Sequence, residues 1–278
     1  LRKYGAATSI VEESTAAWRN SSLRFETDEP SLSWVGRELA WHDYMLRAGT
    51  TYDDFLDARM VNQATSYLYA SGLNAAVRDP LQHVLPLIAT EPATAKGVLL
   101  ATLRQLVKPD TWPAGFQRDL LPYSLMSHGL VWPDRERGPS DLDLYVLLTA
   151  SEYVLQTRDV SFLSERVRTF TLFGGEGENH TVVECLLACF DHLVGPDIGL
   201  GEHGLLRMLT SDWSDVIYHD RAGLEFGSAQ WNRAVQSGES VMNSALAAYV
   251  LPRFGVVLSM AGGHAQAAAN VTAFGKEQ

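Results

Sequence analysis

Cysteine is scarce in this sequence. Only Cys185 and Cys189 occur among 278 residues, four positions apart in a stretch with helical periodicity. Two side chains so placed on one helix rarely reach disulfide geometry. We therefore expect both as free thiols in a reducing, cytoplasmic compartment. The alternative interpretation is that they only fill space in the core.

Basic residues are also few. The sequence has 22 Lys and Arg against 33 Asp and Glu, a net charge of −11. An acidic surface repels phosphate backbones, so we expect no nucleic-acid partner. No apolar run approaches the roughly 20 residues of a membrane span, and no N-terminal signal peptide is visible. We therefore expect no membrane partner.

Motifs for metals and nucleotides are missing too. The eight histidines are scattered without H-E-x-x-H or paired ligand spacing, so we predict no metal site. Neither a Walker loop nor a G-x-G-x-x-G loop is present, and we expect no cofactor. Strand signals are scarce, because alternating β-branched runs and Asn-Gly or Asp-Gly turns are absent.

What the sequence does contain is helical periodicity. Hydrophobic residues make up 46% and charged residues 20%, enough for a sizeable core. Residues 1–32 are polar and are expected to form an arm or linker, followed by a helical domain over 33–278. Apolar residues at three- and four-residue spacing predict helices over 36–48, 57–70, 79–88, 93–107, 140–156, 160–170, 181–194 and 240–251, with a short turn at 255–260.

The expected helix over 140–156 is apolar on nearly every side. Its start reads as a capping box, since Ser140 is followed three residues later by Asp143. A helix that is apolar all round is enclosed by others. The helices recur in pairs, so we predict an all-α fold, a toroid of helical hairpins. Long loops at 111–128, 129–139, 173–179 and 195–213 are where chemistry is expected.

One loop carries an aromatic residue between two acids. It reads Asp212-Trp213-Ser214-Asp215. An indole offers a flat apolar surface for a sugar ring, and a carboxyl beside it can be kept protonated by desolvation and donate its proton to a leaving oxygen. That is the minimal equipment for breaking a glycosidic bond. The alternative is a polar loop whose acids cap helices and whose Trp fills a core gap.

Four stretches together resemble the catalytic domain of the cellobiose phosphorylase family, inverting disaccharide phosphorylases built on a ring of six α-hairpins. Segment 77–83 (V-R-D-P-L-Q-H) resembles F-R-D-Q-L-Q-D, and 139–144 (P-S-D-L-D-L) resembles I-S-D-D-L-L. Segment 211–215 (S-D-W-S-D) is similar to G-D-W-N-D, and 238–241 matches G-E-S-V. They occur in the family's order, which implies a helical ring and carbohydrate chemistry.

The sequence also departs from that family. His83 stands where the family has a sugar-contacting Asp, while Ser211 and Ser214 replace Gly and Asn around the acid. The family's later W-T-W-Y-T-G-S-A stretch, which helps to hold phosphate, is missing, as is its leading β-sandwich. These departures predict either a piece of a longer protein or an incomplete ring.

The resemblance implies roles for particular residues. Asp215 matches the general acid, with a helix cap as the alternative, and Trp213 matches the sugar platform, with a core Trp as the alternative. The other candidate sugar contacts have structural alternatives in hydrogen bonding, ion pairing, capping or the helix dipole. They are Asp212, Arg78, Asp79, Asp141 and Glu239, with His128 and Trp132 as candidates for lining the cleft.

Three functions follow as hypotheses. The first is inverting phosphorolysis of a β-glucoside, with inorganic phosphate as co-substrate and Asp215 as acid. The second is inverting hydrolysis, which needs a second carboxylate as base, Asp141 or Glu239. The third is a non-catalytic glycan-binding or structural remnant. The expected partners are an oligosaccharide or β-glucoside, and either the missing remainder of the chain or a second copy of it.

Overall fold

The computed structural model describes residues 7–54, 56–61, 78–104, 125–126, 130–131, 139–170, 176–196, 198–214, 217–218, 222–225 and 227–278. The chain divides into two compact units, Leu1–Thr50 and Thr51–Gln278, and each is described by itself.

In the described part of the first unit, residues 7–50, the α-helices are α1 (Ala7–Ser21) and α2 (Ser33–Ala48), with a short 3-10 turn, η2 (Pro30–Leu32), before α2. The helix α1 lies within the segment expected to be an arm or linker. Asp43 of α2 is buried, accepts a hydrogen bond from the Leu23 amide at 3.3 Å and pairs with Arg47 at 3.1 Å. This carboxylate therefore joins α2 to the chain that leaves α1.

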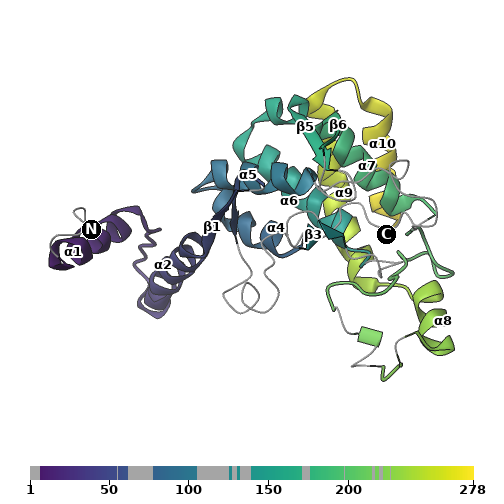
Figure 1. Ribbon diagram of the computed structural model, residues 1–278, viewed down its shortest axis with the longest axis horizontal. Coiled ribbons are helices and arrows are strands. Elements are labelled where there is room, and N and C mark those ends of the chain that lie inside the picture. The colour runs from purple at the N-terminus through teal and green to yellow at the C-terminus, as the bar shows by residue number, and fades with distance from the viewer. Residues whose placement is uncertain are drawn as a thin grey trace. The chain divides into compact units, whose positions relative to one another are not determined.

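The second unit confirms the predicted all-α class. Its described α-helices are α4 (Arg78–Val84), α5 (Pro92–Leu103), α6 (Leu142–Thr157), α7 (Val182–Val194), α8 (Ala229–Ser237), α9 (Val241–Ala261) and α10 (Ala265–Glu277), with 3-10 turns η3 (Leu85–Ile88) and η5 (Val160–Ser164). Helices α4, α5, α7 and α9 pack around α6, and α10 packs on α9 (Figure 1), while Val235 of α8 belongs to a separate small cluster with Met208 and Tyr218.

The centre of this unit is α6, as its sequence predicts. It packs against α4, α5, α7 and α9 (Figure 1). Leu144, Val146, Leu147 and Val154 are completely shielded from solvent. A helix that contacts neighbours on every side must be apolar all round, so the prediction of an enclosed inner helix is confirmed. Cys185 and Cys189, on α7, are buried free thiols.

Short hairpins replace parts of two of the expected helices. The described strands pair as β1 (Thr50–Asp53) with β2 (Ala58–Val61), β3 (Leu125–Met126) with β4 (Leu130–Val131), and β5 (Arg166–Phe170) with β6 (Glu176–Thr181). The helix predicted over 57–70 is wrong at its start, which is β2, and residues 62–70 lie outside the described residues. The helix predicted over 160–170 is wrong from Arg166 onward, which is β5, while its first half is the 3-10 helix η5.

The reason for the second error is visible in β5. Its sequence, R-V-R-T-F, alternates, and Val167 and Thr169 are both buried. Such alternation favours a half-buried strand. Arg158 adopts a left-handed φ of 62° at the end of α6, and Asp159 then caps η5 through the Phe162 amide. These two residues therefore separate η5 from α6, as the break between the two predicted helices implies.

The end of the chain is more helical than predicted. The predicted helix over 240–251 and turn over 255–260 are one helix, α9, and α10 was not predicted. Gly262 and Gly263 have φ values of 73° and 74°, which end α9 because few other residues adopt them. At Gly275, an added Cβ would lie 2.8 Å from Leu251 and from Pro252. The two helices therefore approach closely only with glycine there.

The helix α9 also corrects the expectation that no apolar run approaches membrane-spanning length. It has 21 residues with a mean hydropathy of 1.5 in its most apolar window, enough to span a membrane by length and composition. Core helices pass the same test, and 44% of that window is buried inside the protein. Its packing against α6 and α10 accounts for the apolar sequence.

Candidate functional site

A buried ion pair joins the starts of two helices. Arg78 is the first residue of α4, and Asp141 immediately precedes α6. Arg78 Nε lies 2.8 Å from Asp141 Oδ2, and Arg78 Nη2 donates to Asp141 Oδ1 at 3.1 Å. The Asp141 residue is 0% exposed. Such a two-point contact fixes the guanidinium plane as well as its position.

The capping box predicted at Ser140 and Asp143 is absent from the start of α6. Asp141 is the N-cap residue of α6 and makes no side-chain cap bond. The Ser140 hydroxyl instead donates to the Met208 carbonyl at 2.9 Å. The Asp143 carboxylate lies 2.6 Å from His192 Nδ1 of α7. The prediction of a capping box is therefore wrong, because Ser140 and Asp143 both contact distant partners in place of each other's backbone.

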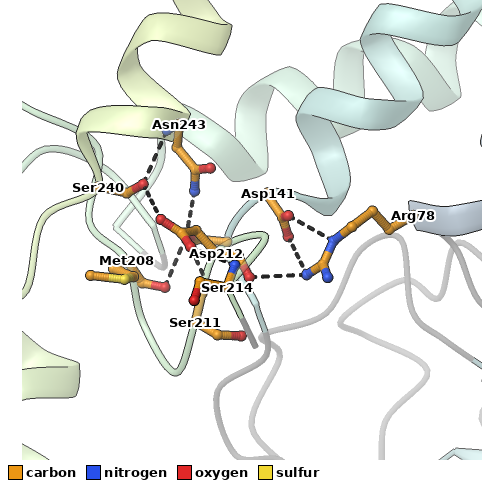
Figure 2. Close-up of polar contacts among 9 residues, drawn as sticks. Arg78, Asp141, Met208, Ser211, Asp212, Ser214, Ser240 and Asn243 are labelled. Carbon is orange, nitrogen blue, oxygen red and sulfur yellow. Dashed lines mark hydrogen bonds and ion pairs between the residues drawn. The ribbon is translucent and has the colours of Figure 1, made fainter. Parts of the chain in front are cut away.

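The same arginine reaches the loop that carries the aromatic residue (Figure 2). Arg78 Nη2 donates to the Asp212 carbonyl oxygen at 3.1 Å. The Asp212 side chain accepts the Ser240 hydroxyl proton on Oδ2 at 2.7 Å and the Ser214 amide on Oδ1 at 2.8 Å. Both carboxylate oxygens of Asp212 are therefore committed to holding the chain.

The start of α9 closes the network. Ser240 is the N-cap, and its Oγ accepts the Asn243 amide at 3.0 Å. The Asn243 side chain donates to Ser140 Oγ at 2.9 Å, and the Ser140 amide donates to the Ser211 carbonyl at 3.0 Å. Four distant segments, the starts of α4, α6 and α9 and the loop at 206–214, thus share one buried polar network (Figure 2).

Trp213 lies at the edge of this network and is 57% exposed. Its neighbours in the chain are held, since the Ile217 amide donates to the Ser214 carbonyl at 3.0 Å, and the Tyr218 hydroxyl to the Ala234 carbonyl at 3.0 Å. Burial raises the pKa of Tyr218 to about 12, so this hydroxyl keeps its proton. Asp215, His128 and Trp132 lie outside the described residues.

Glu239 belongs to a second group of hydrogen bonds. Its Oε1 accepts the His203 amide at 3.0 Å, and its Oε2 accepts the Leu205 amide at 3.3 Å. The hydrogen bond from the His203 amide lowers the pKa of Glu239. Asp79 lies in the first turn of α4 and is half-buried.

Among the predicted site residues, the structure brings Arg78, Asp141 and Asp212 into contact and places Trp213 beside them. The Glu239 side chain holds another turn, although its neighbour Ser240 reaches Asp212. The role of Asp215 as general acid stays a prediction. Within the described ranges, no cluster of three or more His, Cys, Asp or Glu could hold a metal ion, and the expected absence of a metal stays a prediction as well.

Sequence reasoning missed the contributions of Ser240 and Asn243. A Ser followed three residues later by Asn at the start of an apolar run is the pattern of an N-cap, and it was visible in S-V-M-N. Tyr145 was also missed. Burial, and next the charge of Asp141, raise the pKa of this phenol, which shares a hydrogen bond with the Gln82 side chain.

The arrangement holds a loop with an exposed indole against a buried polar network of one guanidinium and two carboxylates. The guanidinium and the carboxylates of Asp141 and Asp212 are neutralised or hydrogen-bonded inside the protein. These three groups therefore position the loop, and the part of the loop that faces solvent is the aromatic surface of Trp213.

Comparison with known proteins finds one matching family model. The family model described as "Glycosyl hydrolase 94 superfamily, catalytic domain" matches residues 40–274. A search of curated proteins finds no match to the chain.

Proposed function

The chain belongs to the glycosyl hydrolase 94 superfamily, whose members act on glycosides as phosphorylases or hydrolases, and we propose that it cleaves a β-glucoside with inversion by phosphorolysis. Asp215 donates the proton to the leaving oxygen, and Trp213 supports the sugar ring. Inorganic phosphate is the co-substrate and attacks the anomeric carbon. No further cofactor takes part, and the buried thiols suit a reducing, cytoplasmic setting.

One observation carries the choice of phosphorolysis over hydrolysis. The two acids considered as the base, Asp141 and Glu239, are both committed to structural contacts, and so is Asp212. Asp141 is 0% exposed with both oxygens against Arg78, and both oxygens of Asp212 accept hydrogen bonds. Both oxygens of Glu239 also accept backbone amides.

An inverting hydrolase needs such a base. Its second carboxylate must take a proton from water, at roughly 6.5–9.5 Å from the acid. Water cannot reach an enclosed carboxylate such as Asp141, and the lowered pKa of Glu239 makes it a weaker base. Phosphate brings its own nucleophilic oxygen, so a phosphorylase needs only the acid.

The neighbourhood of the loop supports the role of Trp213. Its indole is mostly exposed while Asp212 before it is 6% exposed. A sugar ring stacked on the indole would cover apolar area on both partners. It would also exclude water from a neighbouring carboxyl, which favours the protonated form that a general acid requires.

The proposal is tested by following products. The full chain is incubated with β-glucosides, with and without inorganic phosphate. Phosphorolysis with inversion should release α-configured glucose 1-phosphate at a rate that saturates with phosphate, as read by phosphorus and proton NMR. Free sugar formed equally fast without phosphate would instead identify a hydrolase. Saturable glycan binding without any cleavage would identify the non-catalytic alternative.

A further inference from the structure

Glu239 is the carboxylate at the centre of the second group of hydrogen bonds, and it is largely enclosed. Its side chain is 8% exposed, whereas the His203 side chain is 79% exposed. Besides the amides of His203 and Leu205, the His203 ring nitrogen Nδ1 lies 3.1 Å from Glu239 Oε1. The carboxylate thus lies inside one short turn, residues 201–205, and accepts hydrogen bonds from two of its backbone amides.

The turn is built to fit the carboxylate. The Gly201 amide donates to the Leu205 carbonyl at 2.8 Å, and the Gly204 amide to the Gly201 carbonyl at 3.2 Å. A Cβ added at Gly201 would overlap the Glu239 carboxylate. Gly204 has a backbone φ of 80°, which residues other than glycine rarely adopt. Both glycines are therefore needed for the turn to close around Glu239.

The backbone around Glu239 holds the chain that follows the turn. The Met208 amide donates to the Gly238 carbonyl, and the Ser240 amide to the Leu206 carbonyl, both at 2.8 Å. The Leu206 amide also donates to Ser244 Oγ at 2.9 Å. Together with the hydrogen bond between Ser240 and Asp212, these contacts join segment 238–244 to the middle and the end of the loop 201–214.

We propose that Glu239 is a positioning residue, whose carboxylate fixes the turn 201–205 and through it the loop that presents Trp213 and leads into Asp215. It neither binds sugar nor activates water. The inference rests on the proposed function, because the loop is taken to carry the catalytic acid. It assigns Glu239 to neither of the roles considered from its sequence, base or sugar ligand.

The first test measures the turn without any substrate. Hydrogen exchange by mass spectrometry over residues 199–212 is compared in the full chain and in Glu239→Ala. Loss of the acceptor should speed exchange of the His203 and Leu205 amides by at least tenfold. Glu202→Ala is the matched control, since Glu202 is an exposed acid of the same turn, and it should change nothing. Unchanged exchange in Glu239→Ala would overturn the proposal.

The second test reads catalysis with natural and activated glucosides. Misplacing a loop by about 1 Å can cost about 100-fold in rate, so Glu239→Ala should lower kcat for natural β-glucosides by about that factor. Nitrophenyl glucosides need less protonation and should lose less. KM should change less than kcat, since Trp213 moves with the loop but no direct sugar contact is removed. Gly201→Ala keeps the carboxylate but displaces it, and should reproduce this pattern. Glu239→Gln keeps one acceptor and should restore part of the rate.

Other outcomes contradict the proposal in distinct ways. A rise in KM alone would show that Glu239 binds sugar. Equal loss on natural and activated substrates, together with a free-sugar product, would show a base. If the unmodified chain cleaves nothing, the proposed function fails, whereas the exchange experiment still decides whether Glu239 fixes the turn.

Discussion

The two ends of α6 carry two clusters of charge that differ in burial. At its start, Arg78 and Asp141 are paired with side chains 9% and 0% exposed. Just beyond its end, Lys96 pairs with Asp159 at 3.2 Å and with Glu165, with side chains 25–35% exposed. Tyr153 also donates to Asp159 at 2.9 Å. Both clusters tie α6 to its neighbours.

The two clusters differ in whether water can hydrate a charge that has lost its partner. Removing one partner of an enclosed pair leaves a charge that no solvent reaches, whereas a half-exposed charge is rehydrated. The buried cluster is also the one that contacts the loop before Trp213. The cluster at the start of α6 therefore holds the candidate site in place but tolerates substitution poorly. The cluster beyond the end of α6 contributes to stability and tolerates substitution better.

The largest effect should come from Arg78→Met, which leaves Asp141 enclosed without its cation. We expect a loss of about 3–5 kcal/mol in the free energy of unfolding, measured by urea denaturation. The matched change at the other end is Lys96→Met, which should cost at most about 1 kcal/mol. Similar losses from the two variants would break the comparison.

A double variant sharpens this prediction. Adding Asp141→Leu to Arg78→Met removes both charges, so most of the stability should return. The activity should not return with it, because the contact from Arg78 to the Asp212 carbonyl is still absent. Recovery of both would mean that the ion pair does not position the loop.

A smaller difference should appear between two serines that donate to carboxylates. Ser240→Ala leaves Asp212 short of a donor in a buried place and removes the cap of α9, with a loss of about 1–3 kcal/mol. Ser161 donates to Asp159 at 2.5 Å on an exposed surface, so Ser161→Ala should cost less than about 0.5 kcal/mol. Thermal unfolding of both variants, monitored by circular dichroism, checks the order.

The smallest effect concerns acid. The Ser161 hydroxyl, followed by Tyr153 and Lys96, lowers the pKa of Asp159 to about 2 from 3.8. The ionised form therefore adds stability above pH 4, and this contribution disappears as the pH falls from about 4 to about 2. Asp159→Asn should flatten the stability profile in that window by at most about 1 kcal/mol. An unchanged profile would show that Asp159 does not contribute.

The helices could be predicted where a local sequence pattern marks the buried face or the helix start. The apolar run of α6 and the Thr181–Glu184 start of α7 mark their elements locally, and α7 indeed begins with a capping box at these residues. The hairpin β5–β6 was missed because its alternation, at Val167 and Thr169, is only a few residues long. The helix α10 was missed because its apolar residues are mainly Ala.

Three of the predicted site residues lie in one buried polar network, but their partners could not be predicted from the sequence. Motif order pointed to Arg78, Asp141 and Asp212, yet Ser140 and Asp141 looked like a helix cap. Their actual partners, Met208 and Arg78, are more than 60 positions away in the sequence. Competition between local caps and distant contacts is settled by packing, which no short pattern contains. The same holds for Glu239, whose fit to Gly201 depends on the folded turn.

The most direct test of the central claim is the effect of Asp215→Asn on two substrates. The change keeps the shape of the side chain but removes the transferable proton. For natural β-glucosides, kcat should fall by about 10²–10⁴-fold, the usual contribution of a general acid. Nitrophenyl glucosides should retain much of their rate, and sugar affinity should be nearly unchanged. If the rate on natural substrates persists, or both substrates lose activity equally, Asp215 is not the acid.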